Sequence, residues 1–466
     1  MRYAYFADDV RSCEMRMQAQ LAPGTLMQRA AVGVATIAIR LLQDGIGQVL
    51  GARVLLLVGS GDNGGDALYA GAYLAERGAD VTALLLGSAV HQDALAALKQ
   101  ARGRVIESSV EIDFEKIDLV IDGIVGIGGR GCLRPEAALV VAALSEDSIV
   151  LSVDLPSGVD SDSGEITGPH VIADVTAVCG VLKPAHLIDP AASAAGVCEV
   201  IDLELDLSNI ESRIELWQGN DVRNRLPQPG VDADKYRRGV LGVIAGSTEY
   251  PGAGALVCAG ALAVGVGMIR YLGGASEMVI GEHPEVVRAH GRVQAWVIGP
   301  GLTQVTNEGE IATAIGSVEP LIVDAGALPM LPKGRANTLI TPHAGELAAL
   351  LGVERAEVEK RSLHFARLAA DTFGVIVLLK GSTTVIVSPT GLIAVNPTGT
   401  PRLATAGSGD VLAGVIGALA AAGIELFAAA TLGAWIHGLA GRIMSGSGAS
   451  DVASTIPVAI ATVVAG

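Results

Sequence analysis

The chain has 466 residues, a formal net charge of −17, and a composition that is 50% hydrophobic but only 3% aromatic. Such a charge argues against nucleic acid and against anionic membrane surfaces as partners. An anionic ligand would need local sites made of backbone N–H groups and lysines. The apolar residues are mostly Ala, Val, Leu and Ile, and 60 residues are glycine. This composition favours α/β domains with buried parallel strands, and the length predicts two or three of them.

The five cysteines are scattered and include no C-x-x-C pair, which predicts reduced thiols in a cytoplasmic protein. Acidic residues at positions 8 and 9 interrupt any signal-peptide core. The run 250–269 carries no charge and is long enough to raise the question of a membrane span. Its many glycines and alanines favour a buried helix that opens after a glycine loop. We therefore expect no membrane partner.

Strands and helices alternate through both halves of the chain. A polar stretch with prolines, 205–239, indicates a boundary between them. We expect an α/β fold with two domains, 1–215 and 216–466. The first half is expected to have strands at 52–58, 81–86, 117–121, 148–153, 171–178 and 196–201, with a helix at 93–101 among others. The second half is expected to have strands at 240–244, 295–298, 320–323, 338–340 and 375–379, and a hairpin of 383–387 with 392–395.

The first strand is followed by a glycine loop, Gly59–Asp66, that satisfies G-x-G-x-x-G. A nicotinamide-binding Rossmann site would also need an acidic residue at the end of the second strand, about 20 residues on. That strand ends in Gly87-Ser88-Ala89 instead, which disfavours a standard dehydrogenase. The loop still offers N–H groups to a polar ligand and side-chain oxygens from Asp62, Asn63 and Asp66. Turn formation and helix capping are the alternative roles for these three side chains.

Two further loops begin with an aspartate at a strand end, at Asp122 and at Asp154. Ligands of open parallel sheets bind outside the carboxyl ends of the strands, so these loops are expected to converge with Gly59–Asp66. Asn63, Asp122 and Ser157 would then supply oxygen ligands to a hard cation. A set with few carboxylates suits a monovalent ion better than Mg²⁺.

The second half contains Thr405-Ala406-Gly407-Ser408-Gly409-Asp410 directly before an apolar helical run. The first N–H groups of a helix have no partners within it, so an anion can bind there. Asp410 would lie beside that anion as a base for an attacking hydroxyl group. The pattern predicts phosphoryl transfer to an alcohol, although an aspartate in this position also serves as a plain helix cap.

The first half, over about 1–215, resembles the NAD(P)HX epimerase family. The resemblance is carried by Gly59–Asp66, the Asp122 loop with Gly126-Ile127-Gly128, the Asp154-Leu155-Pro156-Ser157-Gly158 loop and Lys183-Pro184-Ala185-His186-Leu187. It implies a hydrated nicotinamide nucleotide as ligand, hydroxylated at ring carbon 6, and potassium bound through Asn63, Asp122 and Ser157. The substrate contacts that it implies are Asp62, Asn63, Gly64, Gly65, Asp66, Gly126, Ile127, Gly128, Gly129, Arg130, Gly131, Cys132 and Asp154.

Loss of hydroxide from ring carbon 6 gives an iminium ion that water can attack on either face. Asp154 is the candidate catalytic carboxylate that moves the proton. Lys183 either balances charge at the site or is a solvated loop residue. The chain departs from the family at Asp62, where asparagine is usual, and at Ile127, where threonine is common.

From Lys235 to about residue 460 the chain resembles the ADP/ATP-dependent NAD(P)H-hydrate dehydratase family, a branch of the ribokinase-like superfamily. The resemblance is carried by Gly239–Gly254, Ile298–Leu302, Thr341–Glu346, Leu379–Thr384 and Ala406–Asp410. It implies ADP or ATP with Mg²⁺, and Asp410 as the catalytic base. Hydrate contacts are implied at Ala253, Gly301, His343 and Asp410, and nucleotide contacts at Lys380, Gly381, Ser382, Thr383, Thr384 and Gly409.

Several of these residues also have a purely structural alternative. His343 would bind the hydrate or cap the following helix, and Glu346 is expected to sit in the first turn of that helix. Lys380 would pair with a phosphate or simply end a strand. Thr303 and Thr383 stand where the dehydratase family usually has glycine.

Together the two resemblances imply a bifunctional repair enzyme acting on NADHX and NADPHX with ADP or ATP. We expect a cytoplasmic homo-oligomer with an N-terminal Rossmann-like αβα sandwich and a C-terminal ribokinase-like αβα domain. One alternative is a ribokinase-like kinase of a vitamin precursor or sugar, with an N-terminal ligand-binding domain. Another is a nucleotide-sensing module without enzymatic activity.

Overall fold

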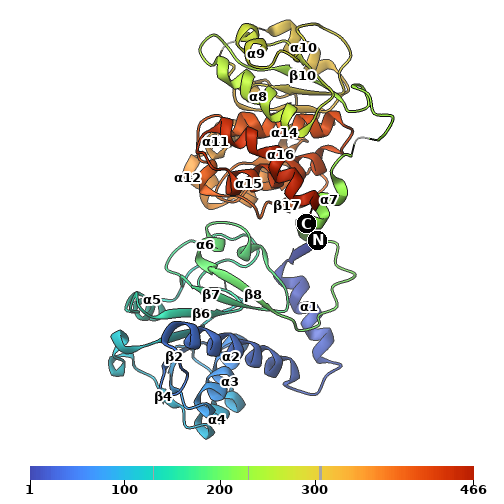
Figure 1. Ribbon diagram of the computed structural model, residues 1–466. Helices are drawn as coiled ribbons and strands as arrows, with labels where there is room; N and C mark the ends of the chain where they lie inside the picture. Colours follow the sequence, from blue (N-terminus) through green and yellow to red (C-terminus); the bar gives the residue numbers. More distant parts are fainter. Residues whose placement is uncertain (130, 229, 304–306, 466) are drawn as a thin grey trace. The chain divides into compact units, whose positions relative to one another are not determined.

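The computed structural model describes residues 1–129, 131–228, 230–303 and 307–465. The chain forms two compact units, Tyr3–Arg213 and Ile214–Gly466, and Met1 and Arg2 belong to the second unit. Figure 1 shows each unit as a sheet flanked by helices.

The N-terminal unit is organised around a seven-stranded sheet in which every strand pair is parallel. The strand order is β4-β3-β2-β5-β6-β7-β8. This is a doubly wound sheet. The chain begins at β2, adds β3 and β4 on one side of it, and then adds β5 to β8 on the other side. The strands are β2 (Arg53–Val58), β3 (Asp80–Leu85), β4 (Arg104–Ile106), β5 (Leu119–Gly123), β6 (Ile149–Val153), β7 (Val175–Cys179) and β8 (Val197–Ile201).

Helices cover both faces of this sheet, because its central strands are apolar on both sides. On one face α2, α3 and α4 bury a cluster that includes Leu56 and Ile121. On the other face α5 packs on a smaller cluster that includes Leu55 and Val120. The helices are α1 (Ala7–Gln18), α2 (Thr25–Ile46), α3 (Asp62–Glu76), α4 (Gln92–Gln100), α5 (Pro135–Ala142) and α6 (Ala191–Ala195), with short 3-10 turns η1 (Ser109–Glu111), η2 (Phe114–Lys116) and η3 (Pro184–His186).

The C-terminal unit has a mixed sheet that runs β9-β17-β16-β15-β14-β13-β12-β10-β11. Six neighbouring strands are parallel, namely β15, β14, β13, β12, β10 and β11. The strand β16 is antiparallel to both of its neighbours, β15 and β17. The strands are β10 (Val240–Ile244), β11 (Met268–Tyr271), β12 (Ala295–Ile298), β13 (Leu321–Val323), β14 (Thr338–Ile340), β15 (Ile376–Leu379), β16 (Val385–Val387) and β17 (Ile393–Val395). The strands β1 (Arg2–Tyr5) and β9 (Arg213–Leu216) each cross the division between the units.

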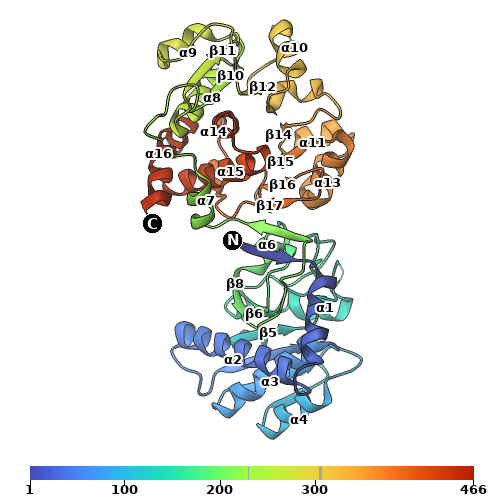
Figure 2. The same ribbon diagram turned by 90° about the vertical axis from the view of Figure 1, so that its right-hand side faces the viewer.

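Helices also lie on both sides of this second sheet (Figure 2). The group α7, α8, α14, α15 and α16 shares one large buried cluster with the sheet. On the other side α10 packs on β12, and α13 packs on β15 and β16. The helices are α7 (Gly219–Arg225), α8 (Pro251–Val264), α9 (Ser276–Glu282), α10 (Glu308–Gly316), α11 (Ala344–Leu351), α12 (Arg355–Lys360), α13 (Ser362–Phe373), α14 (Ser408–Ala421), α15 (Leu426–Ile443) and α16 (Ala449–Ala465), with 3-10 turns η4 (Ala325–Met330) and η5 (Pro401–Leu403).

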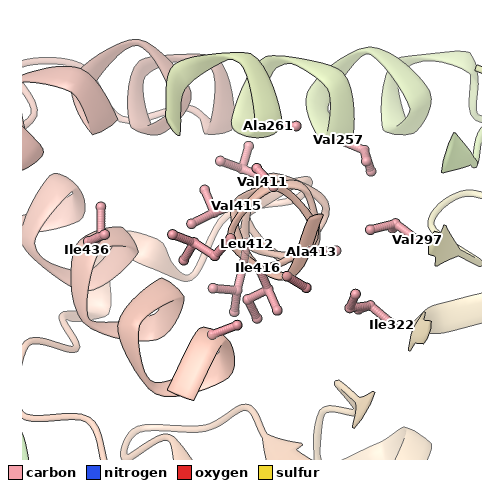
Figure 3. Packing of buried hydrophobic residues seen from close by; sticks show 14 of the residues in the cluster. Val257, Ala261, Val297, Ile322, Val411, Leu412, Ala413, Val415, Ile416 and Ile436 are labelled. Atoms are coloured by element: carbon pink, nitrogen blue, oxygen red, sulfur yellow. The ribbon is translucent and has the colours of Figure 1, made fainter. Parts of the chain in front are cut away.

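Helix α14 is buried along most of its length, and Figure 3 shows it surrounded by α8, α15 and the sheet. Two glycines let α8 and α14 approach each other closely. A methyl group on Gly414 would lie 2.0 Å from the Val257 carbonyl oxygen, and one on Gly260 would lie 2.3 Å from the Val411 carbonyl oxygen. The packing therefore holds α14, and with it the turn that carries Asp410, against the sheet.

The α/β fold with a parallel first sheet is confirmed, and so are the expected hairpin and most expected strands. The uncharged run 250–269 is not one helix: α8 ends at Val264, a left-handed Gly265 follows, and the strand β11 begins at Met268. The strand expected at 171–178 begins only at Val175. The polar stretch 205–239 contains regular structure, namely β9 and α7.

Among the residues that the structure describes, two helices, α2 and α15, are long and apolar enough to cross a membrane by length and composition alone. In α2, 44% of the apolar stretch is buried inside the fold, and in α15 the buried share is 78%. The apolar residues of α15 pack in the same buried cluster as those of α14. Helix α15 therefore has the burial expected of a helix in a protein core.

The close contact of α8 and α14 predicts opposite effects for two glycine substitutions. We expect Gly414→Ala to lower the free energy of unfolding by about 1–3 kcal/mol, because the added methyl group must separate the helices. Gly309→Ala is the matched control, since nothing lies within 4 Å of a Cβ at that α10 position. Alanine is the better helix former, so this control should be neutral or stabilising by up to about 1 kcal/mol. Urea unfolding followed by circular dichroism measures both, and equal stability of the two variants would contradict the close packing.

Candidate functional sites

Each sheet places its polar loops at the carboxyl ends of its parallel strands, and in each sheet the chain reverses direction beside one strand. In the N-terminal unit that strand is β2, which lies between β3 and β5. In the C-terminal unit it is β10, which lies between β11 and β12. Ligand crevices of open α/β sheets form at these positions.

Three loops of the N-terminal unit converge there, as the sequence predicts. A Cβ on Gly59 would lie 1.7 Å from the Ile124 carbonyl oxygen, so the loops after β2 and β5 touch through their backbones. A Cβ on Gly126 would lie 2.2 Å from the Asn63 amide oxygen. The third loop joins through Ser157, whose hydroxyl donates a 2.6 Å hydrogen bond to the Asp122 carboxylate. Asn63, Asp122 and Ser157 are thus brought together.

Asp122 is fully buried at the centre of this contact. Its carboxylate accepts hydrogen bonds from Ser152 Oγ (2.9 Å), Ser157 Oγ, Ser157 N (2.9 Å) and Ile124 N (3.2 Å). Burial raises its pKa, and these donors oppose the rise. The Val125 carbonyl, which accepts a 3.0 Å bond from Ser157 Oγ, adds another oxygen.

These oxygens fit a monovalent cation better than a divalent one. They comprise one carboxylate together with hydroxyl, amide and carbonyl oxygens, a donor set of low charge. Within the described parts of the chain, no group of three or more His, Cys, Asp or Glu side chains could hold a metal ion. The set that meets at Asn63, Asp122 and Ser157 is of a different kind and is compatible with potassium.

Asp154 follows β6 and forms a buried ion pair with Lys183. The Lys183 side chain is only 1% exposed, and its Nζ also donates a 2.9 Å bond to the Cys179 carbonyl. Lys183 is therefore a charge-balancing residue and not a solvated one. The Asp154 carboxylate accepts a further bond of 3.0 Å from Cys179 N. Its backbone is left-handed, with φ of +66°, a conformation that aspartate tolerates better than most residues.

His186 contacts the backbone of both members of this ion pair, Asp154 and Lys183. Its Nε2 lies 2.7 Å from the Asp154 carbonyl oxygen, and its Nδ1 accepts a 2.9 Å bond from Lys183 N. Burial, followed by the Lys183 charge, lowers the pKa of His186 to about 4. The imidazole is therefore neutral near pH 7, with its proton on Nε2 toward Asp154.

More acidic groups surround this ion pair than the single lysine can neutralise. Asp66, in the second turn of α3, is 7% exposed, and its Oδ1 has no hydrogen-bond partner. Burial, reinforced by the charges of Asp62, Asp154 and Glu14, raises the pKa of Asp66 well above its usual value. The pKa of Glu14 is also raised, mainly by burial.

Helix α1 contributes to the site although the sequence motifs gave no sign of it. Arg11 donates a 2.9 Å hydrogen bond to the carbonyl of Ile127, inside the expected substrate loop 126–132. Asp162 accepts a 2.7 Å bond from Ala7 N and so anchors the start of α1. In that loop Gly129 N donates to Gly126 O, and Cys132 is exposed. Arg130 lies outside the described residues.

The second site gathers around Lys380 at the end of β15. Its Nζ forms a 2.8 Å ion pair with Asp324, which follows β13 and is 2% exposed. A Cβ on Gly409 would lie 3.2 Å from Lys380 Nζ and 4.0 Å from the Asp324 carboxylate. The glycine-rich start of α14 thus lies directly beside this pair.

Asp410 lies in the first turn of α14 but does not cap it, because the N-cap is Gly407 with a left-handed backbone. Burial, and then the negative charge of Asp324, raises the pKa of Asp410 to about 7, against the opposing effect of Lys380. A carboxyl group with this pKa is half ionised near neutrality and is suited to accept a proton there.

Asp324 is a residue that the sequence reasoning missed. Like Asp154, it directly follows a buried parallel strand, and Asp122 likewise lies at the carboxyl end of its strand, β5. That signal was available in Val323-Asp324-Ala325-Gly326. The partner could not be found this way, because Lys380 lies 56 residues further along the chain.

His343 and Glu346 form a capping box at the start of α11. His343 Nδ1 accepts a 3.1 Å bond from Glu346 N, and the Glu346 carboxylate accepts a 2.8 Å bond from His343 N. The expected first-turn position of Glu346 is confirmed. The side chain of His343 is 57% exposed, and its backbone lies beside that of Lys380.

The remaining expected contacts of this unit lie in two places. Gly301 meets Ala253, with 2.5 Å between its would-be Cβ and the alanine methyl group. Residues Lys380–Thr384 join β15 to β16, where Thr384 O accepts a 3.0 Å bond from Asn396 N. The loop of Gly301 is tied to Asp324 through Gly299, whose would-be Cβ lies 1.8 Å from the Asp324 carbonyl oxygen.

The two units define a two-domain α/β protein in which each domain carries a lysine–aspartate pair at the carboxyl edge of its sheet. Two family profiles match this chain. Residues 23–185 match the YjeF-related protein N-terminus, and residues 241–456 match NAD(P)H-hydrate dehydratase.

Curated relatives match along nearly the whole chain. The bifunctional NAD(P)H-hydrate repair enzyme Nnr of Mycobacterium leprae (strain TN) is 44% identical over 97% of this chain and 96% of its own. The enzyme of the same description from Escherichia coli (strain K12) is 31% identical, over 86% and 84% of the two chains. The chain therefore belongs to the family of bifunctional NAD(P)H-hydrate repair enzymes.

Among solved structures, the ADP/ATP-dependent NAD(P)H-hydrate dehydratase of Bacillus subtilis, co-crystallised with ATP/Mg²⁺ and soaked with CoA, is 26% identical. The match covers 54% of this chain and 99% of that chain, with a TM-score of 0.48.

The buried Asp154–Lys183 pair predicts a large loss of stability when its cation is removed. Lys183→Met should lower the free energy of unfolding by about 3–5 kcal/mol, because Asp154 would remain charged and buried. The double variant Lys183→Met with Asp154→Asn should regain most of this loss. Arg104→Met, which breaks the exposed pair with Glu111, should change stability by less than about 1 kcal/mol. Urea unfolding measures all three, and equal effects of Lys183→Met and Arg104→Met would contradict the buried pair.

Proposed function

We propose that residues 1–215 interconvert the R and S hydrates of NADH and NADPH, and that residues 216–466 dehydrate the S hydrate at the expense of ADP or ATP. The proposal is supported by family membership and by the positions of the expected catalytic carboxylates, because Asp154 is paired with Lys183 and Asp410 lies near the Lys380–Asp324 pair. The observation on which it most depends is Asp410, a partly buried acid with a pKa of about 7 at a glycine-rich helix start.

The dehydratase reaction follows from the groups around Asp410. The carboxylate takes the proton of the ring hydroxyl, whose oxygen attacks the terminal phosphoryl group of the nucleotide. Lys380 and the first N–H groups of α14 stabilise the charge of the phosphoryl group in transfer. Phosphate is a better leaving group than hydroxide, so elimination then restores the dihydropyridine ring. Mg²⁺ enters with the nucleotide as part of the substrate.

Further roles follow from the family resemblance. The nucleotide is assigned to Lys380–Thr384 and Gly409, and the hydrate to Ala253, Gly301, His343 and Asp410. His343 can bind the hydrate while it caps α11, because more than half of its side chain is exposed.

The epimerase reaction is assigned to the convergent loops of the N-terminal unit. Potassium would be held by Asn63, Asp122 and Ser157, where its charge would help to hold the anionic ligand beside these acidic loops. The expected substrate contacts are the residues of 62–66 and 126–132 together with Asp154. Asp154, which is paired with Lys183, is the base that accepts a proton from the water returning to ring carbon 6.

We also propose a cytoplasmic, homo-oligomeric enzyme. The free state of all five cysteines supports the cytoplasm. The oligomeric state is carried over from the family and can be measured by light scattering of the full chain.

The decisive assay supplies pure S or R hydrate of NADH with ADP and follows the return of NADH absorbance. The S hydrate should react through the C-terminal domain, and the R hydrate only after epimerisation. Replacing potassium with sodium should slow the R reaction alone. Asp410→Asn should slow both by about 10²–10⁴-fold, because the base is lost, while nucleotide binding persists. A stable phosphorylated product without NADH would instead indicate a small-molecule kinase.

The environment of Asp410 also predicts a pH dependence. The base must be ionised, so kcat/KM for dehydration should rise with pH through about 7. Asp324→Asn removes the negative charge that raises the Asp410 pKa and leaves Lys380 to lower it. The rising limb should therefore move to lower pH. Glu346→Gln should shift it in the same direction by less, because Glu346 has the smaller effect. If the rising limb of the pH profile stays at the same pH in Asp324→Asn, then Asp324 does not raise the pKa of Asp410.

A further inference from the structure

We propose that Asp66 is the proton donor of the epimerase reaction, acting on the hydroxyl group that leaves ring carbon 6. The inference rests on the proposed function of the N-terminal domain and adds a second catalytic carboxyl group to it. Hydroxide is a poor leaving group, so its departure needs an acid. The return of water needs a base. Two carboxyl groups held in opposite protonation states supply both.

Asp66 is placed to stay protonated. It is 7% exposed, and its Oδ1 atom is buried without a hydrogen-bond partner. An ionised carboxylate in such a position would lose its hydration without any compensating bond. Burial therefore favours the neutral acid.

The charged groups that surround Asp66 act in the same direction. Asp62 lies on the same helix, Glu14 on α1, and Asp154 at the end of β6, and all three charges raise the Asp66 pKa. The positive charge of Lys183 is paired with Asp154 and not with Asp66, because its Nζ donates to the Asp154 carboxylate and to the Cys179 carbonyl.

Asp154 has the opposite environment. Its carboxylate accepts bonds from Lys183 Nζ and from Cys179 N, both of which favour the ionised form. The thiol of Cys179 remains protonated, since burial raises its pKa well above the usual value. The two carboxyl groups therefore differ in their surroundings: Asp66 Oδ1 is buried without a hydrogen-bond partner, whereas the Asp154 carboxylate accepts bonds from Lys183 Nζ and Cys179 N.

The step balances with these two groups and water alone. The bond between carbon 6 and oxygen breaks, its electron pair stays with oxygen, and the Asp66 proton converts the leaving group to water. The lone pair of the ring nitrogen forms the iminium bond. Water then attacks the other face of carbon 6 and gives its proton to Asp154. The two carboxyl groups exchange this proton with solvent, or the reverse reaction returns it.

The test uses the full chain with Asp66→Asn, a substitution of equal size that removes the acid. Epimerisation of the R hydrate should fall by at least about 10²-fold. Dehydration of the S hydrate by the same polypeptide should stay unchanged, which controls for concentration and for the fold of the other domain. Thermal unfolding checks that the N-terminal domain remains folded. Asp66→Glu keeps a carboxyl group and should recover part of the rate.

A pH profile separates proton donation from a merely structural role. Since the acid acts in its protonated form, the wild-type epimerase rate should fall as pH rises through the raised Asp66 pKa. Asp66→Asn should lose this alkaline limb. The inference is overturned if Asp66→Asn epimerises within a few-fold of wild type with the same limb.

The wild-type protein alone also tests the inference, in case Asp66→Asn does not fold. A wild-type rate that shows no alkaline fall at any pH at which the protein stays folded would overturn it, because a buried acid whose pKa is raised by its neighbours loses its proton only as the pH rises. A wild-type chain that does not epimerise at all would refute the proposed function instead, so the two failures are distinguishable.

Discussion

Both sites depend on the fact that one buried lysine can neutralise only one carboxylate. In the N-terminal unit Lys183 pairs with Asp154, and in the C-terminal unit Lys380 pairs with Asp324. A second carboxyl group in each pocket, Asp66 or Asp410, is left without a cation of its own, and its pKa rises. Proton transfer near neutrality needs groups of this kind. The lysine therefore makes the acids of each site unequal: one is paired with a cation, and the other has a raised pKa.

The fold makes these pairings possible by bringing strand ends together. Asp154 and Asp324 each follow a buried parallel strand, and the lysines follow strands or turns one or two positions away in the sheet. Glycines remove the side chains that would keep the loops apart, as at Gly59 against Ile124 and at Gly299 against Asp324. Helix α14 is fixed by its contact with α8, so the Gly409 backbone meets Lys380 without an intervening side chain. In both domains, close packing of the backbone at these glycines thus positions the charged side chains of the site.

Much of the site could be predicted from local sequence, because glycine loops and strand-end aspartates have local causes. The loops at Gly59, Asp122 and Asp154 were expected to converge, and they do. Roles that depend on distant partners were not predictable in the same way. Arg11 and Glu14 are in a helix that carries no motif, yet α1 contacts the loop of Ile127. The strand β11 was not predicted, because it begins at the end of an uncharged run and hydrophobicity alone does not separate a buried helix from a buried strand.

The sequence by itself determined the class of the protein: two α/β domains, the alternation of their elements, the order of the glycine loops and the family that this order resembles. These features depend on residue type and spacing along the chain. Only the tertiary structure decided the protonation chemistry. Whether an aspartate is ionised depends on its burial and on which cation reaches it, and both are set by residues far away in sequence. That is why the pairing of Asp324 with Lys380, and the lack of a hydrogen-bond partner at Asp66 Oδ1, became visible only in the folded chain.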